Sequence, residues 1–362
     1  MIQLTHLFPI FTVGLDLGDR NCVFVALDAQ GSVVDRGSVT TDAAALASAL
    51  GRFAGGRVIM ETGTNSPWIS EVLTSIGFQV LVADARSVPV RQGKRRKSDR
   101  IDALYLARIG RSDPGLLTLV RHRPLNERAQ MSLIRSRECL VNMRTKAVNC
   151  VRGLLKSYDG IRVPKCDTSC FARRAREALP EELREVLEPI LEQIASMTAA
   201  LKHLDKKVSV LADASEGARA VRQIASVGDL IALTYALTIH DPARFSRSRD
   251  VGAYIGLVPH RFQSGNSDPE LRISKTGNRY LRSLLVNAAQ YILGKRNKQD
   301  SDLRRFGLAM IGDSGSRVRK KKAVIAVARK LAVLMHAVWR SGEVYEPLRQ
   351  ANRNMEAAAT AY

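Results

Sequence analysis

The sequence lacks any apolar run long enough to cross a membrane. Its most apolar stretch, residues 323–339, is interrupted by Arg329 and Lys330, so we expect a helix packed inside the protein. The first residues also lack the basic segment and the small-residue cleavage site of a secretory leader. Both absences argue against a membrane or secreted protein and predict no membrane partner.

Paired cysteines are absent too. The five cysteines are scattered, at Cys22, Cys139, Cys150, Cys166 and Cys170. Three residues separate the last two, but no second Cys or His pair accompanies them to complete a zinc site. We therefore expect plain reduced thiols in a cytoplasmic protein.

Acidic residues are scarce relative to basic ones. The 362 residues include 56 Lys and Arg against 35 Asp and Glu, which gives a net charge of +21 and a pI near 10.2. Such an excess identifies nucleic acid as the first candidate partner. An anionic membrane surface is the second candidate, but no basic amphipathic anchor favours it. The length suits two or three domains.

The first third of the chain predicts a mixed sheet flanked by helices. Apolar or alternating segments at 11–17, 22–29 and 33–41 read as three consecutive strands. Helices at 42–53 and 65–77 then alternate with buried strands at 57–61 and 78–84, and a helix begins near Ser98. The order βββαβαβα predicts an α/β domain whose sheet begins antiparallel and continues in parallel, as in the RNase H-like fold.

A long basic helix is expected over 125–157, followed by a heptad pattern. The apolar positions of this pattern are Leu183, Leu187, Ile190, Ile194, Met197, Leu201, Leu204, Val208 and Leu211. Their alternating spacing of four and three favours a coiled coil that dimerises the protein over a helical hairpin within one chain. Pro189 marks a kink or the onset of the helix.

The remainder, residues 215–345, is expected to be mostly helical. Residues 221–238 have the cadence of two helices joined by a glycine turn, whose amides can hold a phosphate. A Gly- and Ser-rich loop near 260–270 leads into another helix.

Four carboxylates of the first third are candidate metal ligands: Asp16, Glu61, Asp99 and Asp102. Asp16 and Glu61 end the first and fourth strands, and strand ends in an open sheet face a common crevice. Asp99 and Asp102 share one face of a helix start. Four hard oxygen donors suit Mg²⁺ or Mn²⁺, and Asp84, which also follows a strand, is a reserve ligand.

Basic residues cluster beside these acids and again in the last third. The candidate nucleic-acid ligands are Arg95, Arg96, Lys97 and Arg100, then Arg261, Arg272, Lys275 and Arg279, and finally Arg319, Lys320 and Lys321. Contacts of this kind would position a phosphate backbone rather than read sequence. Ser264 lies in the glycine-containing loop among the second group, where a serine by itself is usually a turn residue.

The motifs in combination resemble one family. VGLDLG at 13–18, METG at 60–63, KSDRIDA at 97–103, YIGLVPHRFQSG at 254–265 and RISKTGNRYLR at 272–282 resemble the DEDD-type transposases of insertion sequences, the IS one-ten family. The resemblance extends over nearly the whole chain.

The resemblance implies four regions. These are a RuvC-type, RNase H-like domain over 1–120, a helical coiled-coil segment for dimerisation and RNA holding over 121–212, a mostly α-helical transposase domain over 213–345 and a tail over 346–362. The acid tetrad maps onto Asp16, Glu61, Asp99 and Asp102, with Mg²⁺ as cofactor, and the nucleophilic serine onto Ser264. Ser267 lies in the same loop, but the Ser-Gly pair favours Ser264.

The resemblance also implies the reaction and the partners. Members are similar to site-specific recombinases that join donor and target DNA through a phosphoserine link and are guided by a non-coding bridge RNA. A homo-oligomer follows from the same likeness, a dimer that becomes a tetramer in the synaptic complex, as does a bacterial, nucleoid-associated location.

Two other hypotheses remain open at this stage. A metal-dependent endonuclease resembling a Holliday-junction resolvase would use the acids alone and form no covalent link to DNA. A basic nucleic-acid-binding protein with a degenerate nuclease core would have no activity, although the intact acid set argues against it.

Overall fold

The computed structural model describes residues 10–85, 88, 98–263, 269, 271–313 and 315–350. The chain divides into two compact units, residues 1–124 and 125–362, each with its own core. No helix in the described ranges is long and apolar enough to span a bilayer. All five cysteines are free thiols.

The first unit is a five-stranded mixed sheet between helices. Its elements are β1 (Thr12–Asp16), β2 (Asn21–Leu27), β3 (Val33–Thr40), α1 (Ala43–Leu50), β4 (Arg57–Glu61), α2 (Ser66–Ser75), β5 (Gln79–Ala83) and α3 (Asp99–Ser112). The strand order is β3-β2-β1-β4-β5. β1 pairs with β2 in antiparallel and with β4 in parallel, so the predicted element order and mixed sheet are confirmed.

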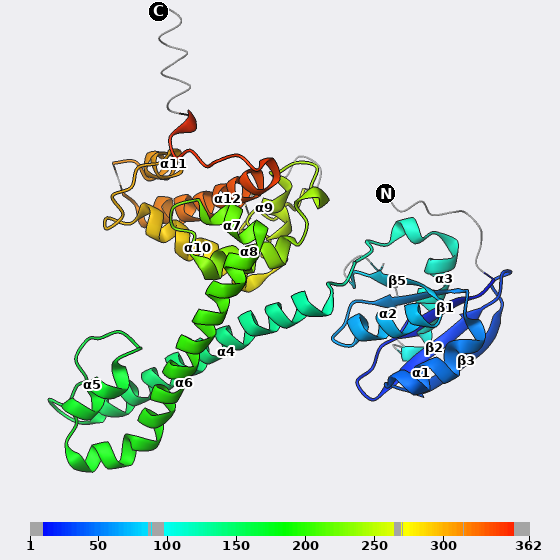
Figure 1. Ribbon diagram of the computed structural model, residues 1–362, viewed down its shortest axis with the longest axis horizontal. Helices are drawn as coiled ribbons and strands as arrows, with labels where there is room; N and C mark the ends of the chain where they lie inside the picture. Colours follow the sequence, from blue (N-terminus) through cyan, green and yellow to red (C-terminus); the bar gives the residue numbers. More distant parts are fainter. Residues whose placement is uncertain are drawn as a thin grey trace, which may run out of the picture. The chain divides into compact units, whose positions relative to one another are not determined.

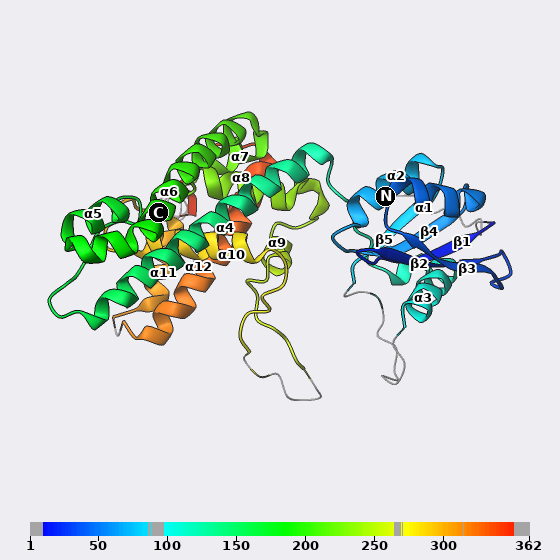
Figure 2. The same cartoon turned by 90° about the horizontal axis from the view of Figure 1, so that it is seen from below.

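The two faces of this sheet carry different helices. Leu46 of α1 and Ile69 of α2 pack with Val13 and Leu15 on one face. Ala103 and Ala107 of α3 pack with strand residues on the other face. Figure 2 shows α1 and α2 on one side of the sheet and α3 on the opposite side. Alternate residues of β1 therefore point to different layers, as the pleat requires.

The second unit consists, in its described ranges, mainly of helices joined by loops, with one isolated β-bridge between Pro259 and Ile273. Its helices are α4 (Leu125–Leu154), α5 (Phe171–Ala178), α6 (Glu181–Ala214), α7 (Glu216–Arg222), α8 (Asp229–Ile239), α9 (Asp250–Tyr254), α10 (Arg279–Leu293), α11 (Asp302–Ile311) and α12 (Arg317–Ser341). The apolar stretch at 323–339 lies within α12, whose Val327, Leu331 and Met335 are fully buried, so the predicted packed helix is confirmed.

The heptad residues of α6 are covered by the same chain. α4 and α6 cross and pack against each other, with α5 at their far end (Figure 1). At that end Leu187, Leu191 and Ile194 pack with Val151 of α4 and Phe171 of α5. All nine positions of the pattern are buried or half-buried within the single chain. The hairpin within one chain therefore accounts for the pattern, while dimerisation stays a prediction.

Pro189 lies inside α6 without ending it. A proline removes one backbone donor and crowds the preceding turn, yet the helix continues on both sides. Leu187 and Leu191, on either side of Pro189, pack in the core and hold the helix in place. The prediction that Pro189 marks the start of the helix is therefore wrong, because α6 begins at Glu181.

A buried histidine joins α12 to the segment between α8 and α9. His336 is fully buried, and its Nε2 lies 3.0 Å from the Pro242 carbonyl while its Nδ1 lies 2.9 Å from Ser248 Oγ. The carbonyl can only accept, so Nε2 donates to it and Nδ1 of the neutral ring accepts from the hydroxyl. Burial, together with the positive charge of Arg340, lowers the pKa of His336 from its ordinary 6.5, although the Pro242 carbonyl opposes this.

We expect this histidine to make the protein less stable in acid. Because the folded pKa is lowered, the unfolded chain binds the proton first, so the free energy of unfolding falls as pH drops below about 6.5. Urea unfolding at about pH 7.5 and about pH 5.5 measures the effect. His336→Gln should lose part of the decrease, and an equal decrease in both proteins would contradict the assignment.

Candidate active site and nucleic-acid interface

Two predicted ligands lie side by side at the sheet edge. β1 and β4 run parallel in a register that pairs Leu15 with Met60, so the next residues along, Asp16 and Glu61, are neighbours. Gly14 and Ile59 both face α3, and side chains two residues apart in a strand share a face. Asp16 and Glu61 therefore extend toward the α3 side at the carboxyl ends of their strands.

The direction of α3 brings the other two acids to the same edge. Near its carboxyl end, the Gly110 carbonyl accepts a hydrogen bond of 2.8 Å from Nη1 of Arg57, at the start of β4. Further back, α3 lies directly over Gly14, where an added Cβ would be 2.0 Å from the Ala103 carbonyl oxygen. The helix thus runs antiparallel to β1 and β4. Its first turn, which contains Asp99 and Asp102, lies toward the edge where those strands end.

The four acids lie toward this edge but do not form a compact cluster of metal ligands. Asp16, Glu61 and Asp102 are half-buried and Asp99 is exposed. Among the described residues, no three His, Cys, Asp or Glu side chains form a group that could hold a metal ion as they stand. Carboxylates on one edge nevertheless have the chemistry that a hard divalent cation requires, so the donor set fits such an ion.

Asp84, the reserve ligand, follows β5 one residue out of phase with Glu61. The strand register pairs Glu61 with Ala83, and Ala83 packs on the α3 side. Since successive residues of a strand alternate between faces, Asp84 is not aligned with Glu61. The tetrad is the better candidate set.

Of the basic residues predicted beside the acids, the structure describes only one. Arg100 is exposed in the first turn of α3, between Asp99 and Asp102. Arg95, Arg96 and Lys97 lie outside the described residues. A cation at a helix amino end is unfavourable for the helix dipole, so Arg100 is better suited to binding an anion than to stabilising α3.

In the second unit, the described residues on either side of the predicted serine loop form two paired legs. The legs, residues 256–263 and 271–277, are joined by hydrogen bonds from Ser274 N to the Val258 carbonyl at 2.9 Å and from His260 N to the Arg272 carbonyl at 2.8 Å. Figure 2 shows the two legs extending side by side between α9 and α10. We call residues 256–277 the serine arm. Ser264 and Ser267 themselves lie outside the described residues.

Basic residues line both the arm and the start of α12. Arg261, Arg272, Lys275 and Arg279 are exposed on the legs and in the first turn of α10. Arg319, Lys320 and Lys321 are exposed at the amino end of α12. The structure brings part of the two groups together, because Arg272, Lys275 and Lys321 line one cavity of about 1300 Å³. The lining of this cavity is largely apolar and includes Ile325 and Leu334.

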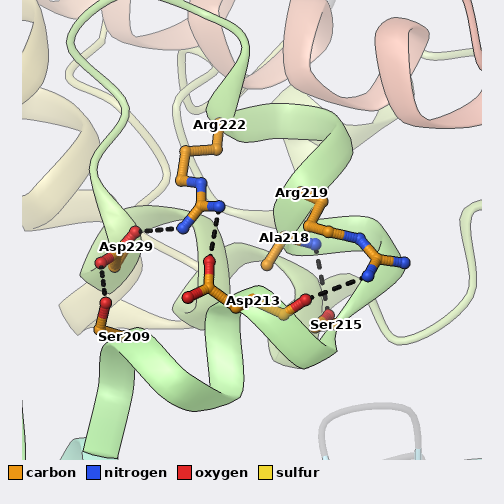
Figure 3. Close-up of polar contacts among 7 residues, drawn as sticks. All are labelled: Ser209, Asp213, Ser215, Ala218, Arg219, Arg222 and Asp229. Atoms are coloured by element: carbon orange, nitrogen blue, oxygen red, sulfur yellow. Dashed lines mark hydrogen bonds and ion pairs between the residues drawn. The ribbon is translucent and has the colours of Figure 1, made fainter. Parts of the chain in front are cut away.

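The turn between α7 and α8 is held by an arginine between two aspartates. Arg222 lies 2.6 Å from Asp213 and 2.7 Å from Asp229, and Ser209 Oγ donates to Asp229 at 2.7 Å (Figure 3). Hydrogen bonds from Ser209 and Arg222 lower the pKa of Asp229. Arg222 is paired with two aspartates in this network. The phosphate site predicted at this turn would therefore depend on backbone amides alone.

Three residues that organise the site were missed from the sequence. Gly14 permits the close approach of α3, the buried Arg57 joins β4 to the far end of α3, and the buried Arg282 contacts the base of the serine arm. A glycine inside an apolar strand often marks a close backbone approach, and this signal was available in VGLDLG. No comparable physical signal identified either arginine, although Arg282 ends the RISKTGNRYLR motif.

Comparison with known proteins identifies a family for most of the chain. Residues 13–159 match the DEDD IS110 family model, which is described as a transposase, and residues 218–304 match the transposase IS116/IS110/IS902 family. The chain is 30% identical over 264 residues to the transposase for insertion sequence element IS1111A of Coxiella burnetii, covering 70% of this chain and 69% of the relative.

Two further relatives agree. A putative transposase of Sinorhizobium fredii, y4rJ, is 28% identical over 82% of this chain and 80% of its own length. The transposase for insertion sequence element IS1328 of Yersinia enterocolitica is 27% identical over 80% of this chain and 85% of its own. The resemblance drawn from the motifs is confirmed: the chain belongs to the IS110 family of insertion-sequence transposases and is a DNA transposase.

Proposed function

We propose that this transposase is a site-specific recombinase that cuts and rejoins donor and target DNA through a phosphoserine at Ser264. In this proposal Asp16, Glu61, Asp99 and Asp102 hold Mg²⁺, and a non-coding bridge RNA guides the choice of DNA. The observation that carries it is the shared sheet edge, to which two strand ends and the first turn of α3 each contribute acids.

We further propose that the first unit is an RNase H-like domain of the RuvC type. Support comes from the strand order β3-β2-β1-β4-β5, with an antiparallel start and parallel continuation. In such a sheet β1 is central, and acids at its carboxyl end and at that of β4 lie where a ligand crevice is expected.

The chemistry assigned to the chain itself is a transesterification. Oγ of Ser264 gives up its proton and bonds to phosphorus, and the 3′ oxygen of the broken DNA strand leaves and takes up a proton. One phosphate ester replaces another, so no external energy source is required. A divalent cation at the acid edge would stabilise negative charge on the phosphoryl oxygens.

The basic residues position the phosphate backbone in this scheme. Arg100 would act beside the acids, whereas Arg272, Lys275 and Lys321 would act together from the wall of their shared cavity. Each neutralised phosphate releases bound counterions, so binding should weaken as salt is raised. The same charge suits DNA and the proposed RNA alike. The proposed dimer, and the tetramer of the synaptic complex, would bring several such surfaces to one DNA junction.

Ser264→Ala tests the proposal. The full-length protein is incubated with flank-derived RNA and with plasmids bearing the element's ends and its target, then resolved on a denaturing gel. The wild type is expected to yield a covalent protein–DNA adduct and recombined DNA, and Ser264→Ala neither, because the attacking oxygen is gone. DNA and RNA binding should persist.

Ser267→Ala is the matched control, since it removes a hydroxyl from the same loop and should preserve the adduct. An adduct that persists in Ser264→Ala would sink the serine assignment. DNA cleavage without any adduct, dependent on Asp16 alone, would instead identify the resolvase-like endonuclease.

A further inference from the structure

The base of the serine arm is joined by one buried arginine. Arg282, in the second turn of α10, is only 9% exposed. Its Nη1 donates to the Ile255 carbonyl at 2.9 Å and to the Thr276 carbonyl at 2.7 Å. Ile255 directly precedes the outgoing leg and Thr276 lies in the returning leg. A single guanidinium therefore holds both ends of the arm against α10.

The backbone around this contact leaves no space for a side chain at two glycines. Gly256 and Gly277 both have a φ of +70°, which disfavours any residue with a side chain. A Cβ on Gly256 would lie 2.4 Å from Thr276 N, and one on Gly277 would lie 2.1 Å from the Tyr254 carbonyl oxygen. The two legs are therefore in backbone contact at their base, where Arg282 binds.

Arg282 binds carbonyl groups rather than an acid. Within the described part of the chain, no ion pair joins Arg282 to a carboxylate, and the acceptors of its hydrogen bonds are backbone carbonyls. Burial, with the nearby charge of Arg279, lowers the pKa of Arg282. A buried cation without an acid partner is a poor source of stability compared with an apolar side chain of similar size. A role in holding the arm explains the arginine at this position better than a contribution to the stability of the fold does.

We propose that Arg282 is a positioning residue for the serine nucleophile, which it directs by fixing the base of the arm. The proposal rests on the proposed function, because Ser264 belongs to the chain segment that the two legs carry. Arg282 touches neither DNA nor the reacting atoms in this scheme. Its loss should slow covalent attack far more than it weakens DNA binding, because loosened legs still present Arg272 and Lys275 to the phosphate backbone.

Arg282→Met tests the proposal first without DNA. Methionine retains much of the apolar length but cannot donate to either carbonyl. We expect trypsin to cleave the full-length protein at Arg261 and Arg272 about tenfold faster, because lost hydrogen bonds of a charged donor release the legs. Cleavage is followed at these two bonds by mass spectrometry.

Arg304→Met is the matched control. Arg304 also donates to two backbone carbonyls, those of Ile292 and Gly294, but at the opposite end of α10 from the arm. Its replacement removes the same kind of contact from the same unit. Cleavage at Arg261 and Arg272 should then stay at the wild-type rate.

The second readout is adduct formation on the plasmids described above. We expect Arg282→Met to form the serine adduct about tenfold more slowly while its affinity for duplex DNA stays within about twofold, and Arg304→Met to match the wild type. Unchanged cleavage and unchanged adduct rate in Arg282→Met would overturn the inference. An adduct that survives in Ser264→Ala would instead overturn the proposed function on which it rests.

Arg282→Lys tests the positioning role of Arg282 if the methionine variant does not fold. A single ammonium is a compact donor that fits two separate carbonyls less well than a guanidinium does. Cleavage at the two arm bonds should rise about threefold and the adduct rate should fall by a similar factor. Wild-type behaviour of this variant in both assays would count against the proposal.

Discussion

Asp16→Asn is expected to abolish DNA cleavage while leaving the fold intact. Asparagine preserves the size of the side chain but removes the negative charge at the centre of the acid edge. Loss of several kcal/mol of charge stabilisation in the transition state should lower the cleavage rate by roughly a thousandfold or more. The rate is measured on plasmid DNA across a series of Mg²⁺ and Mn²⁺ concentrations.

Asp19→Asn is the control for this experiment. Asp19 is exposed in the turn between β1 and β2, three residues beyond Asp16, and lies outside the predicted tetrad. Its variant should cleave at the wild-type rate with unchanged metal dependence. Equal activity of Asp16→Asn and Asp19→Asn would remove Asp16 from the site.

Gly14→Ala is expected to have the largest effect on stability. The added methyl group would lie 2.0 Å from the Ala103 carbonyl oxygen and 2.4 Å from Ala107 N, and both atoms belong to the backbone of α3. The helix must move away from β1, which should destabilise the first unit by about 3 kcal/mol or more. The displacement also separates Asp99 and Asp102 from Asp16, so cleavage should be lost as well.

Hydrogen exchange of β1 and α3 peptides in the full-length protein measures this effect locally. Gly51→Ala is the matched control, because Gly51 has a helical φ of −55° and nothing within 4 Å of its added Cβ. That change should leave exchange unaltered or slightly slower. Wild-type protection of α3 in Gly14→Ala would contradict the close packing.

The elements of the first unit could be predicted because their patterns are local. Buried strands such as β4 read as short apolar runs, and α1 begins where Asp42 accepts a hydrogen bond from Ala45 N. The strand order could not be derived in the same way, because it depends on which edges pair in space. The central place of β1 emerges only from its simultaneous pairing with β2 and β4.

The heptad pattern of α6 illustrates the limit of periodicity. The pattern shows which stripe of a helix is buried but not what covers it. In the structure α4 and α5 of the same chain cover it, with Phe171 packed beside Leu187 and Leu191. A partner chain would produce the same spacing, so the preference for a dimer had no physical basis in the stripe alone.

The candidate site could be predicted in its residues but not in its supports. Asp16 and Glu61 were identifiable because each ends an apolar strand, and Asp99 and Asp102 because they share a helix face. Arg57 acts through the Gly110 carbonyl, 53 residues away, and Arg282 through the carbonyls of Ile255 and Thr276, 27 and 6 residues away. Every residue has a backbone carbonyl, so the amino-acid sequence does not indicate which one accepts a hydrogen bond. Such contacts can be found only in the three-dimensional structure.

The closure of the α4–α6 hairpin within one chain has a consequence for synthesis on the ribosome. Met131 and Ile134 of α4 belong to a core that also contains Val208 of α6 and Leu331 of α12. The sheet unit forms its core from the first 124 residues and can fold as soon as they emerge. The apolar stripe of α4, by contrast, must wait about 75 further residues for Val208 of α6. A nascent chain stalled before α6 would therefore expose that stripe, and is the form of this transposase most dependent on chaperones.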